Sequence, residues 1–195
     1  MDVRVLDVHR DDLSGWFSLF SACQQDWSDE PLGDYDAAIA LLRNPPPTFG
    51  PELHWAAFVD GQLVGHAKVS FPDGDFGTAK VTVHPDFRGR GIGSSLLHAA
   101  LPTLRSRGRT TLEGWSVTKG GPGDLWAARR GFVVVTETVL QRLCLHDVSD
   151  SVWDVPLAPG YRVVSWDDRA PDDLVASYAA AQDAIQDAPL GNTSF

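Results

Sequence analysis

The sequence predicts an α/β fold (α+β in arrangement), in which helices flank a mixed, mostly antiparallel sheet. Segments with the apolar alternation of strands follow segments with helical apolar spacing along most of the chain. The pair Asp60-Gly61, typical of a tight hairpin turn, joins two of the strand-like segments. With 195 residues, 43% of them hydrophobic, the chain can build one full domain and part of a second.

The strands follow from short apolar segments bounded by turn residues. They are expected at 3–8, in the hairpin at 53–71, at 79–84, at 110–117 and, as one or two final strands, at 132–145. Pro85 ends the third of these segments, because proline cannot donate to a sheet ladder.

The helices follow from apolar residues at helical spacing. One begins near Asp11, a second covers 36–44 and stops at the prolines 45–47, a third covers 91–107, and a short fourth covers 124–130. Pro102 is expected to bend the third helix or to mark a local irregularity there. Gly131 closes the fourth.

Charge is distributed unevenly along the chain. The net charge of −10 argues against general nucleic-acid binding. Residues 1–40 and 147–195 each contain nine acidic and two basic residues, whereas 41–146 contain eight acidic and twelve basic ones. The basic middle suits an anionic ligand. The acidic N-terminal segment either favours a cationic ligand or is an ordinary solvated surface.

The sequence indicates a cytoplasmic protein without a membrane partner. No apolar run approaches the ~20 residues that a membrane span needs. The acidic start, MDVRVLDVHRDD, lacks the apolar stretch of a signal peptide. Cys23 and Cys144 lie in apolar stretches, so we interpret both as reduced core residues and expect neither a disulfide nor a metal site.

The stretch HPDFRGRGIG, residues 84–93, places small and positive residues directly before a helix. Such a helix start presents backbone N–H groups and the positive end of the helix dipole. Glycines let an anion approach these groups, and Arg88 and Arg90 add positive charge. The pattern therefore predicts a pyrophosphate cradle. The spacing G-R-G-I-G fits neither the dinucleotide fingerprint nor a P-loop.

The longer stretch VTVHPDFRGRGIGSSLL, residues 81–97, resembles the acyl-CoA-binding motif of the GNAT superfamily of N-acyltransferases. That motif reads Arg/Gln-x-x-Gly-x-Gly/Ala after a strand that ends in a proline turn, and its fixed positions are occupied by Arg88, Gly91 and Gly93. The preceding hairpin, a following Leu-Glu strand and the junction Gly131-Phe132 extend the resemblance over roughly residues 2–145. The resemblance implies a GNAT domain at 1–146.

The resemblance also implies that acetyl-CoA is the acyl donor and that no metal takes part. The strand backbone at 81–83 would pair with the pantetheine arm, and the N–H groups at 89–94 would hold the pyrophosphate. The implied binding residues are Val81, Thr82, Val83, Arg88, Gly89, Arg90, Gly91, Ile92, Gly93 and Ser94.

In the family, a primary amine usually attacks the thioester directly within a ternary complex. An amine with a pKa near 10.4 needs about 4–5 kcal/mol to become neutral at pH 7, so a positioned base or a water chain helps. Glu113 occupies the Leu-Glu position, where some members carry their proton acceptor, and is our candidate base; alternatively it is a structural carboxylate. His66 and His84 are possible relays, or simply packed side chains.

The sequence departs from the family pattern at the proton donor. Many relatives place a tyrosine four residues before the glycine of the Gly-Phe junction, and here that position is Ala127. The three tyrosines, Tyr35, Tyr161 and Tyr178, lie elsewhere. Either another group protonates the departing thiolate, or it leaves unaided, or catalysis is weak.

The tail resembles the opening of a second GNAT domain, as in tandem-GNAT proteins. After a linker at 147–160, residues 161–195 repeat N-terminal features in the same order, as a strand and a helix. The matching pairs are Asp12-Leu13 with Asp173-Leu174, and Pro31-Leu32-Gly33 with Pro189-Leu190-Gly191. A strand and one helix cannot bury a core alone. The segment therefore docks on its own domain, joins another copy or a partner GNAT chain, or belongs to a longer tandem protein.

Together these observations predict an acyl-CoA-dependent N-acyltransferase that moves acetyl from acetyl-CoA to a primary amine of a small molecule. The acidic N-terminal segment favours a cationic acceptor, such as an aminoglycoside or a polyamine. A protein N-terminus, a lysine or a hydroxyl acceptor stays open. The alternatives are a non-catalytic acyl-CoA-binding scaffold and the regulatory half of a tandem protein.

Overall fold

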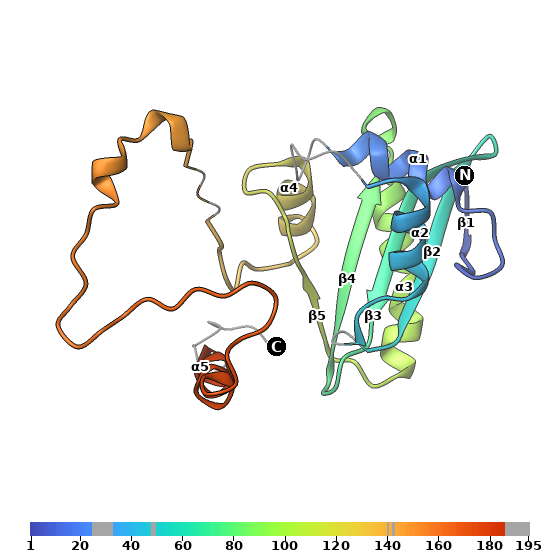
Figure 1. The fold of residues 1–195 in the computed structure, drawn as a ribbon. Helices are drawn as coiled ribbons and strands as arrows, with labels where there is room; N and C mark the ends of the chain where they lie inside the picture. The colour runs from blue at the N-terminus through green and yellow to red at the C-terminus, as the bar shows by residue number, and fades with distance from the viewer. Residues whose placement is uncertain (25–32, 48–49, 140, 142, 186–195) are drawn as a thin grey trace. The chain divides into compact units, whose positions relative to one another are not determined.

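The computed structural model describes residues 1–24, 33–47, 50–139, 141 and 143–185. The chain divides into two compact units, residues 1–133 and 134–195 (Figure 1). The first unit contains a sheet and the helices α1 to α4. The expected domain boundaries at residues 146 and 160 stay predictions.

In the described part of the chain, five strands form a single sheet in the order β1-β2-β3-β4-β5. Their bounds are β1 Asp2–Val5, β2 Glu52–Val59, β3 Gln62–Ser70, β4 Phe76–Val83 and β5 Thr111–Gly114. β1 to β4 pair in antiparallel fashion, whereas β5 lies parallel to β4. The mixed, mostly antiparallel sheet expected from the sequence is thus confirmed.

Helices cover both faces of this sheet. Their bounds are α1 Ser14–Cys23, α2 Tyr35–Arg43, α3 Ile92–Ser106 and α4 Pro122–Ala128, with a short 3₁₀ turn, η3, at Pro85–Phe87. α3 packs on one face, while α1 and α2 lie on the other (Figure 1). α3 continues through Pro102 as one helix. No helix in the described ranges combines the length and apolarity that a membrane crossing requires.

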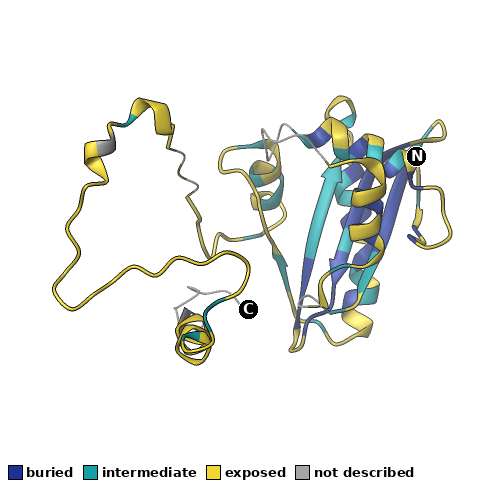
Figure 2. Cartoon of the chain, viewed as in Figure 1, coloured by how far each residue is buried: buried dark blue, intermediate teal, exposed yellow. Residues whose placement is uncertain are grey.

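Two apolar clusters, one on each face, hold the layers together. On the α3 face, Trp55, Ala67 and Leu96 are among the buried residues, and Figure 2 shows this burial concentrated in β2 and β3. On the other face, Trp16 of α1 and Ile39 of α2 are buried. Full burial of a leucine or isoleucine side chain, such as Leu96 or Ile39, stabilises the fold by about 1.5–3 kcal/mol.

Local chemistry accounts for the boundaries of several elements. Asp60 and Gly61 both have positive φ, 50° and 81°, as a two-residue hairpin turn of this type requires. Asp34 caps α2 by accepting a hydrogen bond from the Ala37 N–H at 2.8 Å. The expected hairpin and second helix therefore form with bounds shifted by a residue or two.

Two sequence-based expectations about residues 132–145 are wrong. Where final strands were expected, the described residues at 132–139, 141 and 143–145 form none, and Val133 and Val139 are each 79% exposed. A run of β-branched residues becomes a strand only where a neighbouring strand pairs with it and buries it. The described residues of this run have no strand partner and are mostly exposed. Cys144 is exposed, not in the core, whereas Cys23 is buried as expected; neither forms a disulfide.

The second unit contains the short 3₁₀ turns η4 Leu145–Asp147 and η5 Asp150–Val152 and the helix α5 Val175–Ile185. α5 begins after Asp173-Leu174, where the repeat predicts a helix, but residues 161–166 form no strand. Trp166 packs edge-on against Tyr178 with ring centroids 5.5 Å apart. Of the proposed repeat, Pro31-Leu32 and Pro189-Leu190-Gly191 lie outside the described residues.

Candidate functional site

The C-terminal half of β4 offers an open backbone edge. Pairing between β4 and β5 runs from Phe76 opposite Thr111 to Ala79 opposite Gly114 and ends there. The His84 N–H donates to the Val64 oxygen of β3 at 2.9 Å, which fixes the direction of alternate backbone groups. Val81 and Val83 therefore point their backbone groups away from β3, toward the side that β5 has left.

The turn after β4 is held by its own side chains. The His84 ring accepts a hydrogen bond from the Asp86 N–H at 3.3 Å, so His84 serves as a cap of η3. The Arg90 guanidinium donates to the backbone carbonyl oxygen of Asp86 at 2.9 Å and lies 5.0 Å from the centre of the Phe87 ring. Arg90 thus stabilises the turn through these two contacts.

The N-terminus of α3 has the geometry of an anion site. Gly89 and Gly91 have φ values of 75° and 81°, a left-handed conformation that other residues rarely adopt. Gly91 is the N-cap and supplies no side chain, and the first helical bond runs from the Ser95 N–H to the Gly91 oxygen. The N–H groups at 92–94 thus have no acceptor within the helix. The first turn of α3 also contains no acidic residue that would repel an anion.

The motif residue Arg88 ties this turn to α1. Its Nε donates to the Val83 oxygen at 3.1 Å, and its terminal nitrogen lies 3.9 Å from the Cys23 sulfur. The Cys23 thiol also donates to the Val83 oxygen, at 3.5 Å. The carbonyl of Val83 therefore accepts hydrogen bonds from within the protein. Arg88 fixes the end of β4 relative to α1.

Helix α4 docks on the start of α3 through Ser94. The Trp126 indole N–H donates to Ser94 Oγ at 3.2 Å, and the Arg130 guanidinium donates to the same oxygen at 2.6 Å. Sequence reasoning assigned no role to either side chain. The only signal for Arg130 was an Arg pair within the basic middle of the chain. The structure places the positive charge of Arg130 at the N-terminus of α3. Ala127, on the same helix as Trp126, has no hydroxyl that could donate a proton.

Glu113 lies at the point where β4 and β5 part. It pairs with Thr78, one residue before the last β4–β5 pair, and it is partly buried. Residues opposite each other in a sheet share a face. Register therefore places Glu113 in one row with Thr78, Ser70 and Glu52, on the face that α1 and α2 cover.

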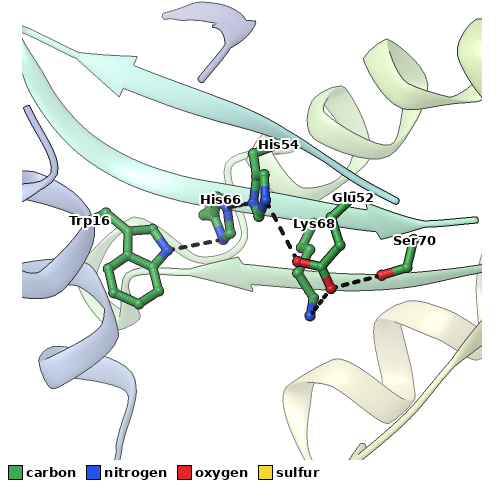
Figure 3. Close-up of polar contacts among 6 residues, drawn as sticks. All are labelled: Trp16, Glu52, His54, His66, Lys68 and Ser70. Carbon is green, nitrogen blue, oxygen red and sulfur yellow. Dashed lines mark hydrogen bonds and ion pairs between the residues drawn. The ribbon is translucent and has the colours of Figure 1, made fainter. Parts of the chain in front are cut away.

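A buried chain of polar side chains crosses this same face (Figure 3). The Trp16 indole N–H donates to His66 Nδ1 at 3.3 Å, and because indole can only donate, the His66 proton sits on Nε2. His66 Nε2 then donates to His54 Nδ1 at 3.1 Å. His54 Nε2 in turn lies 3.7 Å from Glu52 Oε2. The indole of Trp16, at one end of this row of side chains, thus fixes the tautomers of both histidines.

Glu52, at one end of this row of hydrogen-bonded side chains, is paired with a lysine. Glu52 Oε1 accepts from Lys68 Nζ at 2.7 Å and from Ser70 Oγ at 3.1 Å (Figure 3). The Glu52 side chain is only 5% exposed, so this pairing satisfies a carboxylate that would be costly to bury alone.

Burial keeps both histidines neutral. It lowers the pKa of His66 to about 3, with His54 and Lys68 adding to the effect. It lowers the pKa of His54 to about 4, against an opposing contribution from Glu52. This row of hydrogen-bonded side chains ends at the indole N–H of Trp16, which does not release a proton. The row therefore cannot conduct protons through Trp16. It instead anchors α1 to the sheet, and His66 is part of that anchor.

One cluster outside the first unit has metal-ligating side chains. Cys144, His146 and Asp147 bring one ligand atom each within 4.8 Å of the others. All three are exposed and come from one short stretch of chain, an arrangement that is common on solvated surfaces without an ion.

The comparison with known families gives the class of protein. The family described as "Acetyltransferase (GNAT) family" matches residues 13–132, which include β2 to β5 and α1 to α4. The chain belongs to this family.

The proteins that are similar to this chain in sequence include mycothiol acetyltransferases. That of Nocardiopsis dassonvillei is 29% identical over 66% of this chain, and that of Mycolicibacterium vanbaalenii is 31% identical over 73%. The matches cover only 38% and 41% of the two relatives, so the chain spans about two fifths of their length. An acetyltransferase of Pectobacterium atrosepticum is 32% identical over 55% of this chain and 70% of its own length.

Solved structures confirm the fold. A tandem GNAT protein from the clavulanic acid biosynthesis pathway aligns with a TM-score of 0.65 and 24% identity, over 95% of this chain and 64% of its own. A Pyrococcus furiosus protein described as a putative acetyl transferase aligns with a TM-score of 0.55 and 19% identity, over 73% and 100% of the respective chains. The first unit therefore has the GNAT fold.

Proposed function

We propose that this chain is an acetyl-CoA-dependent N-acetyltransferase domain that acetylates a primary amine of a small molecule. The observation that carries the proposal is the continuity between the open edge of β4 at Val81–Val83 and the uncapped start of α3 at 92–94. An extended arm that ends in a pyrophosphate fits this arrangement. Membership of the acetyltransferase family supports it.

In this proposal the pyrophosphate binds the backbone N–H groups at 89–94, and Arg130 adds positive charge beside them. The pantetheine arm then runs back along the edge of β4, from Val83 toward Val81. Its thioester end accordingly reaches the point where β4 and β5 part, after Ala79. Glu113 lies beside that point.

The proposed reaction is a direct transfer. A neutral acceptor amine attacks the thioester carbon, the N–C bond forms and the C–S bond breaks. Glu113 takes the proton from the amine, and coenzyme A leaves as a thiolate that must regain a proton. Ala127 cannot supply that proton, so the proposal assigns it to the solvent or to the acceptor.

The acceptor is proposed to be a small amine. The names of the relatives, mycothiol acetyltransferases, favour a small molecule over a protein. The acidic residues of the N-terminal 40 positions, nine against two basic ones, favour an acceptor with positive charge.

A second candidate is a binding or regulatory domain within a longer tandem protein. Two observations favour it: Ala127 replaces the usual tyrosine, and the chain spans about two fifths of the relatives named above. In this candidate, residues 161–195 begin a second GNAT repeat that contacts the first domain, a second copy or a partner chain.

A calorimetric titration with acetyl-CoA tests the proposal. We expect 1:1 binding of micromolar affinity that Gly91→Glu weakens at least tenfold, because a carboxylate would repel the pyrophosphate. Gly108→Glu is the matched control, since Gly108 also has positive φ with open space around it, but lies beyond the other end of α3. Absence of binding to the wild-type protein, or equal loss in both variants, would refute the cradle.

If acetyl-CoA binds, release of free coenzyme A in the presence of a panel of amines separates the two candidates. Turnover with a small amine supports the enzyme. Binding without turnover across the panel supports the non-catalytic or regulatory domain.

A further inference from the structure

We propose that Lys80 is a self-acetylation site, at which the protein accepts the acetyl group of its own bound acetyl-CoA. This inference rests on the proposed function, because it requires acetyl-CoA to lie along the edge of β4. It assigns a covalent modification to a side chain that neither the motif nor the proposed transfer to an acceptor uses.

Lys80 occupies the position on β4 where the thioester is proposed to lie. It comes directly after Ala79, the last residue paired with β5, and directly before Val81, whose backbone faces the open edge. The arm is anchored beyond Val83 and runs backward along this edge. Its reactive end therefore reaches the neighbourhood of Lys80.

The Lys80 side chain also lies on the face from which an amine would attack. In the β3–β4 register Lys80 lies opposite Lys68, on the face covered by α1 and α2. Its Nζ is 5.7 Å from the centre of the Phe20 ring of α1. Glu113, the proposed base, belongs to the neighbouring row on that face. The flexible four-carbon stem of lysine can swing Nζ from Phe20 to the strand edge.

The surroundings of Lys80 make its amine reactive. Burial, together with the neighbouring Lys68, lowers the pKa of Lys80 to about 8. Lys68 Nζ lies 2.7 Å from Glu52 Oε1, and this contact holds the Lys68 side chain in place on the strand opposite Lys80. At about pH 8 roughly half of the Lys80 side chains are then neutral, against about 0.4% for a lysine with a pKa of 10.4. The nucleophilic fraction rises about a hundredfold.

The step balances without an external reagent. The neutral Nζ attacks the thioester carbonyl carbon, an N–C amide bond forms, and the C–S bond breaks. Coenzyme A leaves as a thiolate, and the proton lost by Nζ returns to that sulfur. The products are acetyl-lysine and coenzyme A, and nothing is oxidised or reduced. Acetylation also removes the positive charge opposite Lys68.

The sequence makes the test sharp, because it contains three lysines: Lys68, Lys80 and the exposed Lys119. The protein is incubated at about pH 8 with acetyl-CoA that carries a deuterated acetyl group, and labelled peptides are quantified over time by mass spectrometry. We expect label on Lys80 at least tenfold faster than on Lys119, which reports ordinary solution chemistry.

Three variants separate the explanations. Lys80→Arg is expected to abolish the fast label, whereas Lys119→Arg leaves it unchanged. Gly91→Glu is expected to remove the fast label on Lys80 and to spare the slow label on Lys119. Calorimetry and circular dichroism on Lys80→Arg verify that it still folds and binds acetyl-CoA.

Two results would overturn the inference while sparing the proposed function. One is a wild-type protein that binds acetyl-CoA by calorimetry but labels Lys80 no faster than Lys119. The other is a fast label on Lys80 that survives Gly91→Glu. A wild-type protein that binds no acetyl-CoA would refute the proposed function itself, and this inference with it.

Discussion

Lowering the pH from about 7.5 to about 4.5 is expected to destabilise the first unit through its buried histidine pair. His54 and His66 are 5% and 7% exposed and hydrogen-bonded to each other at 3.1 Å. Within the fold both rings are neutral at pH 7.5, because burial lowers the pKa of His54 to about 4 and that of His66 to about 3.

The sign of the effect follows from proton uptake. In the unfolded chain each histidine has a pKa near 6.5 and gains a proton as the pH falls below that value. In the folded protein neither ring accepts one until the pH reaches about 4 and about 3. The free energy of unfolding is therefore insensitive to these groups above pH 6.5. It falls progressively between pH 6.5 and the folded-state pKa values.

The magnitude follows from the same values. At about pH 4.5, roughly two units below the unfolded pKa, each neutral buried histidine costs about 2–3 kcal/mol. The pair together lowers the free energy of unfolding by about 5 kcal/mol. That is a large share of the 5–15 kcal/mol by which natural domains are typically stable.

Urea unfolding, followed by circular dichroism at both pH values, measures this effect. Carboxylates also titrate in this range, so the comparison is between the wild-type protein and the double variant His54→Gln, His66→Gln. The double variant is expected to be less stable at pH 7.5 and to lose about 5 kcal/mol less than the wild-type protein on acidification. The exposed His98 gives the control, since His98→Gln should keep the full pH dependence.

A double variant with the same pH dependence as the wild-type protein would refute the reasoning. It would mean that the two rings are protonated in the fold at pH 4.5. The hydrogen-bond chain from Trp16 would then not exist in the form that the structure gives, because a protonated His66 cannot accept from the indole.

Two further predictions concern packing and chemistry. Gly65→Ala is expected to cost about 1–3 kcal/mol in the free energy of unfolding and to weaken acetyl-CoA binding. The added Cβ would lie 2.8 Å from Ile92 and 2.9 Å from Leu96 and would displace the start of α3; thermal unfolding and calorimetry measure both effects. Glu113→Gln is expected to lower turnover at least tenfold without changing acetyl-CoA affinity. Unchanged turnover in steady-state assays with an accepted amine would remove Glu113 as the base.

Several features of this protein were determined locally and could be predicted from the sequence. The hairpin forms at Asp60-Gly61 because both residues tolerate the positive φ that the turn needs. The start of α3 has no side-chain cap because its N-cap residue is Gly91, whose φ of 81° is left-handed. In each case a few neighbouring residues settle the backbone conformation, so a short stretch of sequence carries enough information.

Other features were decided only by the tertiary structure. His54 and His66 meet because β2 and β3 pair in a particular register, and Trp16 reaches them from another element. Arg130 joins the mouth of α3 because α4 docks on Ser94. The segment at 132–145 contains residues of high β propensity and still forms no strand in its described part.

The physical reason is the same in all of these cases. Periodicity and turn chemistry act over a few residues, whereas strand register, helix docking and the burial of polar groups depend on contacts between distant segments. Whether a histidine is neutral, or a valine run is a strand, depends on what packs against it, and that is fixed only when the chain has folded.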